Sequence, residues 1–248
     1  MAREVRRQLP GANIEFYGDN GRAPYGHLQK EIIANYARQI LNFLAGKNID
    51  IAIIACNTAT VASWEEVMDE YPFPVLGVVN PGVRGALAAT RNKKVGVIAT
   101  EFTIKSEAHK SGIQAMDPEV EVFGQACPKF TLLVEAGKTS GPEVEEAVSG
   151  YLATFKGKGI DTLILGCTHY PVLVDTIRRY VDPDVTIVDP AVKTVAEAKE
   201  ILEQKGLVAD NSFPVYNFYT SGDPELFMKV GTTILGWPIE EVEKVVLG

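Results

Sequence analysis

The stretch GIDTLILGCTHYP, residues 159–171, carries the pattern that decides the fold. Its run of mostly apolar residues, 162–165, leads through Gly166 to Cys167. A continuous apolar run of this length that ends at a glycine is typical of a strand covered on both faces of a parallel sheet. The stretch therefore predicts a buried strand with a thiol immediately beyond its carboxyl end.

The same pattern occurs a second time in the chain. KNIDIAIIACNTATV, residues 47–61, aligns without gaps with KGIDTLILGCTHYPV, residues 158–172, and the two cysteines coincide. A weaker similarity pairs residues 13–24 with 119–130, which both read as a strand ending at a glycine. An internal repeat of this kind predicts two similar lobes, each with one cysteine at the carboxyl end of an equivalent strand. Open α/β sheets bind ligands at that edge.

Short runs rich in valine and isoleucine alternate with helical patterns, which predicts an α/β fold. The two lobes should each be a mostly parallel sheet flanked by helices, related by pseudo-symmetry, with the active site in the cleft between them. The predicted strands are 51–55, 75–79, 95–99, 121–124, 163–166, 186–188 and 215–219. One lobe should comprise residues 1–92 plus 207–248 and carry Cys56, and the other should comprise 93–206 and carry Cys167.

Two helices have clear boundaries in the sequence. Apolar residues recur every fourth position in the first, which Gly46 should cap at its C-terminus, and the second covers residues 191–205 and ends before Gly206. The recurring residues of the first helix are Leu28, Ile32, Tyr36, Ile40 and Leu44.

Composition excludes several classes of partner. The net charge of −8 and the lack of a Lys/Arg tract argue against nucleic acid, and no stretch reaches the ~18 apolar residues of a membrane span. Three cysteines without an export signal indicate free thiols in a reducing cytoplasm.

The paired cysteines suggest a reaction. A thiol near a helix N-terminus is expected to have its pKa lowered from about 8.5. Two thiols that face each other across a cleft could act on opposite faces of one carbon, one removing a proton and the other delivering one. The residues after the cysteines carry hydrogen-bonding side chains suited to binding carboxylates, and these residues are Asn57, Thr58, Thr168 and His169.

Other interpretations of the cysteines remain open. Each could be a buried, inert residue, which is the favoured interpretation for Cys127 because the repeat gives it no counterpart thiol. A disulfide between Cys56 and Cys167 is disfavoured in a reducing compartment. A zinc site at these cysteines and His169 lacks a fourth ligand and a common spacing. A Cys167–His169 nucleophile for acyl transfer would leave Cys56 without a role.

Five motifs together resemble the glutamate racemases of the aspartate/glutamate racemase superfamily. These motifs are PYG (24–26), ACNTAT (55–60), GVVNPG (77–82), CPKFTLLVEAG (127–137) and GCTHYP (166–171). The resemblance implies an amino-acid racemase, an isomerase that needs no cofactor, pyridoxal phosphate or metal. Such an enzyme converts L-glutamate to D-glutamate in the cytoplasm for peptidoglycan synthesis, cell wall biogenesis and cell shape. It also implies a homodimer.

The resemblance further implies roles for individual residues. Cys56 and Cys167 match the two catalytic thiols. His169 matches an auxiliary acid/base beside Cys167, and Glu135 matches a second helper on that side. Substrate contacts are implied for Tyr25, Gly26, Asn57, Thr58, Thr100, Thr103, Thr168 and His169. His27 and His109 receive no role, and we expect them on helix surfaces.

One departure from the family concerns the start of the chain. The family opens with a strand followed by Asp-Ser-Gly, whereas MAREVRRQLP (1–10) reads as the middle of a helix. The repeat agrees, because the counterpart of the strand at 95–99 would lie upstream of Met1. We therefore expect an N-terminally shortened form of doubtful activity. A racemase, isomerase or decarboxylase of another small carboxylate, such as aspartate, and a two-lobed non-catalytic carboxylate-binding protein stay open as alternatives.

Overall fold

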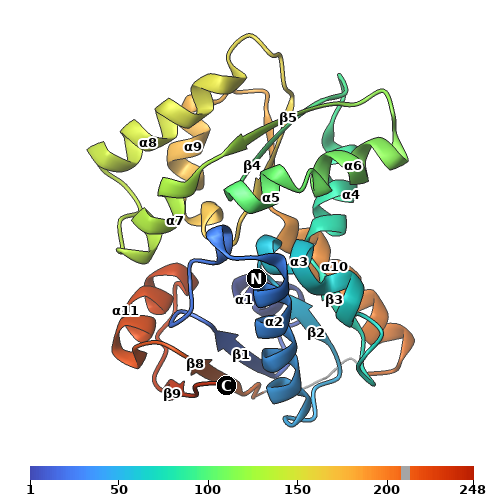
Figure 1. Ribbon diagram of the computed structural model, residues 1–248, viewed down its shortest axis with the longest axis vertical. Coiled ribbons are helices and arrows are strands. Elements are labelled where there is room, and N and C mark those ends of the chain that lie inside the picture. Colours follow the sequence, from blue (N-terminus) through green and yellow to red (C-terminus); the bar gives the residue numbers. More distant parts are fainter. Residues whose placement is uncertain (208–212) are drawn as a thin grey trace. The chain divides into compact units, whose positions relative to one another are not determined.

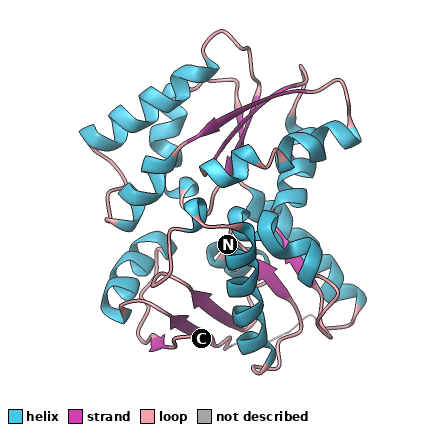
Figure 2. Ribbon diagram, in the orientation of Figure 1, coloured by secondary structure: helices cyan, strands magenta, loops and turns pink. Residues whose placement is uncertain are grey.

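The computed structural model describes residues 1–207 and 213–248 and divides into two compact units (Figure 1). Unit 1 comprises Met1–Ile54, Ala62–Leu76 and Val195–Gly248, and unit 2 comprises Ala55–Val61 and Gly77–Thr194. Residues 208–212, which the sequence assigns to the first lobe, lie outside the described residues. In both units helices flank the strands, as predicted (Figure 2).

Unit 2 contains one continuous sheet of four parallel strands in the order β5-β4-β6-β7. The central strand β4 is hydrogen-bonded to a neighbour on each side, so that Val97 pairs with Gly124 and with Ile164. Every residue of β6 is buried, which explains its continuous apolar sequence. The strands are β4 (Lys94–Ala99), β5 (Glu121–Ala126), β6 (Thr162–Gly166) and β7 (Thr186–Val188).

Helices cover both the sheet and the strand ends of unit 2. The helices between Gly77 and Thr194 are α4 (Val79–Ala89), α5 (Glu101–Lys105), α6 (Ala108–Met116), α7 (Pro128–Glu135), α8 (Pro142–Leu152), η2 (Ala153–Phe155), η3 (Tyr170–Leu173) and α9 (Val174–Tyr180). Two helices continue from one unit into the other along the chain, and these are α3 (Asn57–Val67) and α10 (Pro190–Gln204).

The lobe boundary differs from the one that the sequence suggests. The sequence assigns residues 77–92 to the first lobe, but Val83 and Ala86 of α4 are buried in a core cluster with Val95, Val97 and Ile164 of the unit 2 sheet. The segment Ala55–Val61, which carries Cys56, also groups with unit 2. Both cysteines of the repeat therefore lie in unit 2, because tertiary packing rather than order along the chain sets the division.

The strands of unit 1 form two separate sheets among the described residues, in the orders β1-β8-β9 and β2-β3. The repeat aligns β2 with β6, and the weaker similarity aligns β1 with β5. In unit 2 the strand β4 lies between β5 and β6 and pairs with both. No described strand joins β1 to β2 in this way. The strands are β1 (Ile14–Gly18), β2 (Ala52–Ile54), β3 (Val75–Gly77), β8 (Tyr216–Thr220) and β9 (Glu243–Lys244), and the helices are α1 (Ala2–Gln8), η1 (Tyr25–His27), α2 (Lys30–Ala45) and α11 (Pro224–Leu235).

Helix α2 forms where it is predicted and is followed by Gly46, but it buries a different face. Its buried residues are Ile33, Ala34, Ala37 and Leu41, whereas Ile32 is 38% exposed. A strict four-residue spacing drifts by roughly 40° at each step because a turn holds about 3.6 residues. The predicted stripe therefore winds away from the core.

Among the described residues, no helix combines the length and the apolar character needed to cross a membrane.

Candidate active site

Cys167 lies directly beyond the buried end of β6 and is 7% exposed. The strand ends at Gly166, where a Cβ atom would come within 2.9 Å of both the Ala99 Cβ and the Ile98 carbonyl oxygen. Only glycine fits at this close approach to β4. The packing of the strand end thus holds the backbone of Cys167 at the carboxyl edge of the sheet.

A chain of polar side chains leads away from the Cys167 thiol. The Cys167 Sγ atom lies 3.6 Å from His169 Nδ1, and His169 Nε2 lies 2.7 Å from Glu135 Oε1. Thr131 Oγ1 lies 3.9 Å from the same sulfur. Thr131 and Glu135 are four residues apart on α7, so they share one face of the helix. Thr131 is not among the residues predicted from the sequence, although its spacing from Glu135 is a usable signal.

This series of side chains favours a negative charge on Cys167 and a positive charge on His169. Burial works to raise the pKa of the Cys167 thiol, but the hydrogen bond and positive charge of His169 lower it below its ordinary value. Burial likewise opposes a charged His169, yet its hydrogen bonds to Cys167 and Glu135 raise the pKa of the imidazole to about 10. At neutral pH the arrangement therefore favours a thiolate beside an imidazolium, with Glu135 on the far side of the ring.

Cys56 behaves in the opposite way. It precedes α3, and its carbonyl oxygen accepts the backbone N–H of Thr60 at 2.8 Å. Burial raises the pKa of the Cys56 thiol to about 11, and the backbone N–H groups of Ala59 and Thr58 only partly offset this effect. The negative charge of Cys167 raises the pKa further, which places the two sulfurs within electrostatic reach of each other. The expected lowering by the helix N-terminus is thus wrong for Cys56, because desolvation outweighs it.

Three threonine hydroxyl groups cluster beside Cys56. The Thr58 Oγ1 atom lies 2.9 Å from that of Thr100 and 3.3 Å from that of Thr103, and the latter two are 3.1 Å apart. Thr100 also caps α5 by accepting the Thr103 N–H. Asn57 is 3% exposed, and its Oδ1 atom has no hydrogen-bond partner among the described residues. Unit 2 therefore offers a buried, unsatisfied acceptor next to a set of hydroxyl groups.

The remaining predicted residues are divided between the units. Thr168 is exposed in unit 2, and its Oγ1 atom lies 3.3 Å from His169 Nδ1. Tyr25 and Gly26 belong to η1 of unit 1. Cys127 is fully buried, its thiol donates to the Gln125 carbonyl oxygen, and burial raises its pKa. These properties fit an inert core thiol.

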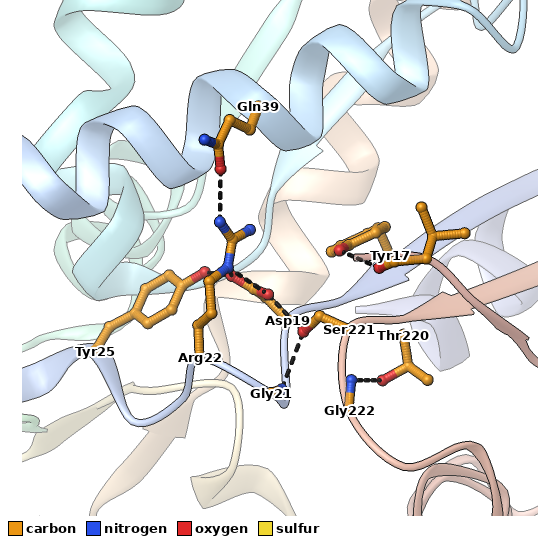
Figure 3. A network of polar contacts seen from close by, with 10 residues as sticks. Tyr17, Asp19, Gly21, Arg22, Tyr25, Gln39, Thr220, Ser221 and Gly222 are labelled. Atoms are coloured by element: carbon orange, nitrogen blue, oxygen red, sulfur yellow. Dashed lines mark hydrogen bonds and ion pairs between the residues drawn. The ribbon is translucent and has the colours of Figure 1, made fainter. Parts of the chain in front are cut away.

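Tyr25 is held by a polar network within unit 1 (Figure 3). Its hydroxyl donates to Asp19, which also forms an ion pair with Arg22 at 2.8 Å and accepts the Ser221 hydroxyl at 2.6 Å. Arg22 donates to Gln39 at 2.5 Å. Asp19 and Ser221 are not predictable from local sequence patterns, because they are 202 residues apart and the pairing of β1 with β8 brings them together.

A model of the Asp/Glu/Hydantoin racemase family matches residues 1–198. The chain belongs to this family. A glutamate racemase from Oceanobacillus iheyensis is 39% identical to it over 236 residues, which cover 94% of this chain and 86% of the relative.

Solved structures of the racemase family agree with this assignment. The glutamate racemase isoform RacE1 from Bacillus anthracis superposes with a TM-score of 0.92 at 34% identity, covering 100% of this chain and 92% of the other. A glutamate racemase from Francisella tularensis in complex with D-glutamate has a TM-score of 0.90 at 33% identity, covering 98% and 91%. These similarities confirm the predicted two-lobed α/β racemase fold.

Proposed function

We propose that the protein interconverts L-glutamate and D-glutamate without a cofactor, by proton transfer between two thiols and the substrate Cα. The observation that carries the proposal is the pair Cys56 and Cys167, which lie within electrostatic reach and have opposite shifts in pKa. A thiolate that accepts a proton and a thiol that donates one are the two groups that inversion at one carbon requires.

In the proposed step the Cys167 thiolate takes the Cα proton and becomes a thiol. The electron pair of the broken C–H bond is delocalised into the α-carboxylate. The Cys56 thiol then donates its proton to the opposite face of Cα and becomes a thiolate. The reverse reaction starts with Cys56 as the thiolate and Cys167 as the thiol, so each cysteine acts as the base for one enantiomer.

Neighbouring groups support this chemistry. His169 stabilises the Cys167 thiolate in the resting state, and Glu135 stabilises the charged His169. The unpaired Asn57 Oδ1 suits the α-ammonium group, which carries only donors. For the carboxylates and the rest of the substrate we propose the hydroxyl and N–H groups of Thr58, Thr100, Thr103 and Thr168. The substrate contacts that the resemblance implies for Tyr25 and Gly26 stay predictions.

Glutamate is favoured over aspartate by the relatives. Curated glutamate racemases are 36–39% identical to the chain over nearly its whole length, whereas an aspartate racemase from Picrophilus torridus is 15% identical and shares only the fold. Two acid/base thiols also favour a racemase over a decarboxylase, which needs one proton donor. We further propose that the product D-glutamate serves peptidoglycan synthesis in the cytoplasm, and that the protein acts as a homodimer.

The test is incubation with each enantiomer of glutamate in D2O, followed by chiral analysis and measurement of deuterium at Cα. Racemisation together with exchange at Cα is the outcome that supports the proposal. Cys56→Ala and Cys167→Ala should each abolish racemisation while each retains exchange of one enantiomer, and the two variants should retain opposite enantiomers.

Cys127→Ala is the matched control, because Cys127 is a buried thiol outside the proposed pair. It should racemise glutamate like the unmodified chain. Near-normal racemisation by Cys56→Ala or Cys167→Ala would refute the two-thiol assignment. Calorimetric binding of glutamate without any exchange would support the carboxylate-binding alternative. Preferential turnover of aspartate would show that aspartate, rather than glutamate, is the substrate.

A further inference from the structure

The hydroxyl group of Thr131 contacts the same sulfur atom that His169 contacts. Its Oγ1 atom lies 3.9 Å from Cys167 Sγ, and His169 Nδ1 lies 3.6 Å from that sulfur. Hydrogen bonds to sulfur are longer than those to oxygen because the sulfur atom is larger. A thiolate carries no proton of its own, so Thr131 is the donor of this pair whenever Cys167 is ionised.

The acceptor that a helical threonine commonly uses is already occupied. A threonine inside a helix often donates to the carbonyl oxygen four residues earlier, which for Thr131 is that of Cys127. This oxygen instead accepts the Tyr170 hydroxyl at 2.9 Å and the Phe130 N–H at 3.1 Å. Both of its lone pairs are therefore engaged. The Thr131 hydroxyl also interacts with the Tyr170 hydroxyl, but the charged Cys167 sulfur is the stronger acceptor.

Packing fixes the helix that carries Thr131. Phe130 of α7 is fully buried, and its ring meets the Tyr170 ring edge-on at a centroid distance of 5.1 Å. Because Tyr170 directly follows His169, this contact ties α7 to the segment just beyond the thiol. One turn further along α7, Glu135 contacts the far nitrogen of His169 at 2.7 Å. One face of α7 thus presents a hydroxyl to the sulfur and a carboxylate to the imidazole.

The Cys167 sulfur has one charged neighbour, His169, among the described residues that interact with it directly, and Glu135 acts through that imidazole. Burial raises the pKa of the other ionisable groups that interact with the sulfur, which leaves them neutral at physiological pH, and these are Cys56, Cys127 and Tyr170. Thr131 adds a donor without adding a charge. It stabilises the thiolate more than the thiol, since a protonated sulfur is only a weak acceptor.

We propose that Thr131 is a positioning residue whose hydroxyl donates to the Cys167 thiolate and holds this sulfur ready to act as a base, while His169 supplies the balancing charge. When the thiolate takes a proton, the sulfur becomes a weak acceptor and the bond from Thr131 weakens. The interaction therefore favours the state in which proton removal begins. This role rests on the proposed racemisation, but the ionisation of Cys167 is measurable without any turnover.

The experiment is an NMR titration of the whole chain labelled with carbon-13 at the cysteine Cβ atoms, whose chemical shifts distinguish a thiol from a thiolate. Thr131→Val removes the hydroxyl and keeps the shape of the side chain. We expect it to raise the midpoint of the Cys167 ionisation by about one pH unit, a tenfold change of the size that one hydrogen bond to a charged group gives. The buried Cys127 should stay at its thiol position and serves as an internal reference. An unmoved Cys167 midpoint would overturn the proposal.

Matched variants separate the hydroxyl group from the fold. Thr131→Ser keeps the hydroxyl and should restore the midpoint of the unmodified chain, and a shift that persists in this variant would contradict the role of the hydroxyl. Thr154→Val is the control, because this exposed threonine donates to Gln125 and should leave the midpoint unchanged. Thr131→Ala is a second variant without the hydroxyl, at a helical position that suits alanine, and it tests the proposal even if Thr131→Val fails to fold.

Steady-state kinetics separate a failure of this assignment from a failure of the proposed function. In Thr131→Val the acidic limb of kcat/KM should move to higher pH by about one unit, whereas a purely structural loss would lower the profile without moving it. A raised midpoint in a chain that racemises neither enantiomer would refute the proposed function while supporting the hydrogen bond. Racemisation with an unmoved midpoint would refute the assignment of Thr131 alone.

Discussion

The two units differ in how their sheets are held together. In unit 2 the central strand β4 pairs with β5 on one side and β6 on the other, so one sheet carries the whole unit. In unit 1 the repeat counterparts of β5 and β6 lie in separate sheets, and β1 instead pairs with β8 from the C-terminal part of the chain. Similar strand segments thus give a continuous sheet only where a central strand links them.

The same contrast extends to the two cysteines of the repeat. Cys167 follows a completely buried strand of the continuous sheet and is supported by His169 and Glu135. Cys56 follows a strand of the two-stranded sheet, and its thiolate is favoured by backbone N–H groups and the Thr58 side chain. Equivalent positions in a repeat therefore carry thiols with opposite shifts in pKa.

The largest effect is expected from a pair of residues matched by the repeat. Ile164 of β6 is fully buried, whereas its counterpart Ile53 of β2 is only partly buried. Ile164→Ala should reduce the unfolding free energy by about 3–5 kcal/mol and Ile53→Ala by roughly 1–2 kcal/mol, because fewer contacts are lost at the second site. Equal losses in urea denaturation would mean that the two sheets support their strands equally well.

A smaller effect is expected on turnover when the side chains that favour the Cys167 thiolate, His169 and Glu135, are replaced. His169→Asn should lower kcat by about 10²-fold and leave KM nearly unchanged, because an acid/base group acts mainly in the transition state. Glu135→Gln should lower kcat by about tenfold, since it acts through His169. A rise in KM alone, measured by steady-state kinetics with each enantiomer, would make His169 a binding residue instead.

The smallest effect concerns stability as a function of pH. The raised pKa of His169 contributes stability that is full below about 6.5, its ordinary value, and is lost as the pH rises through about 10. The lowered pKa of Cys167 contributes stability above its ordinary value of 9.0 that is lost as the pH falls. Up to about pH 9 the two contributions change in opposite directions, and at higher pH the loss from His169 acts alone. The unmodified chain should therefore lose about 2–4 °C more in Tm than the double variant His169→Asn/Cys167→Ala between pH 9 and 10.5, measured by thermal denaturation.

Part of the fold was predictable because it depends on neighbours along the chain. The predicted strand at 186–188 coincides with β7, and the other predicted strands lie within a few residues of those observed. The helix α2 ends at the predicted glycine, but its buried face does not follow the predicted stripe. Periodicity indicates that an element forms, whereas the direction of its core depends on what packs against it.

The sequence by itself determined the alternation of strands and helices, the repeat, the cysteines just beyond two strand ends and the family resemblance, because all of these are local patterns. Only the tertiary structure decided that both thiols belong to unit 2, that Glu135 supports His169 from 34 residues away, and that His109 is buried. It also decided the opposite shifts in pKa of Cys56 and Cys167. The physical reason is that desolvation and charge pairing depend on groups that come together only when distant elements pack.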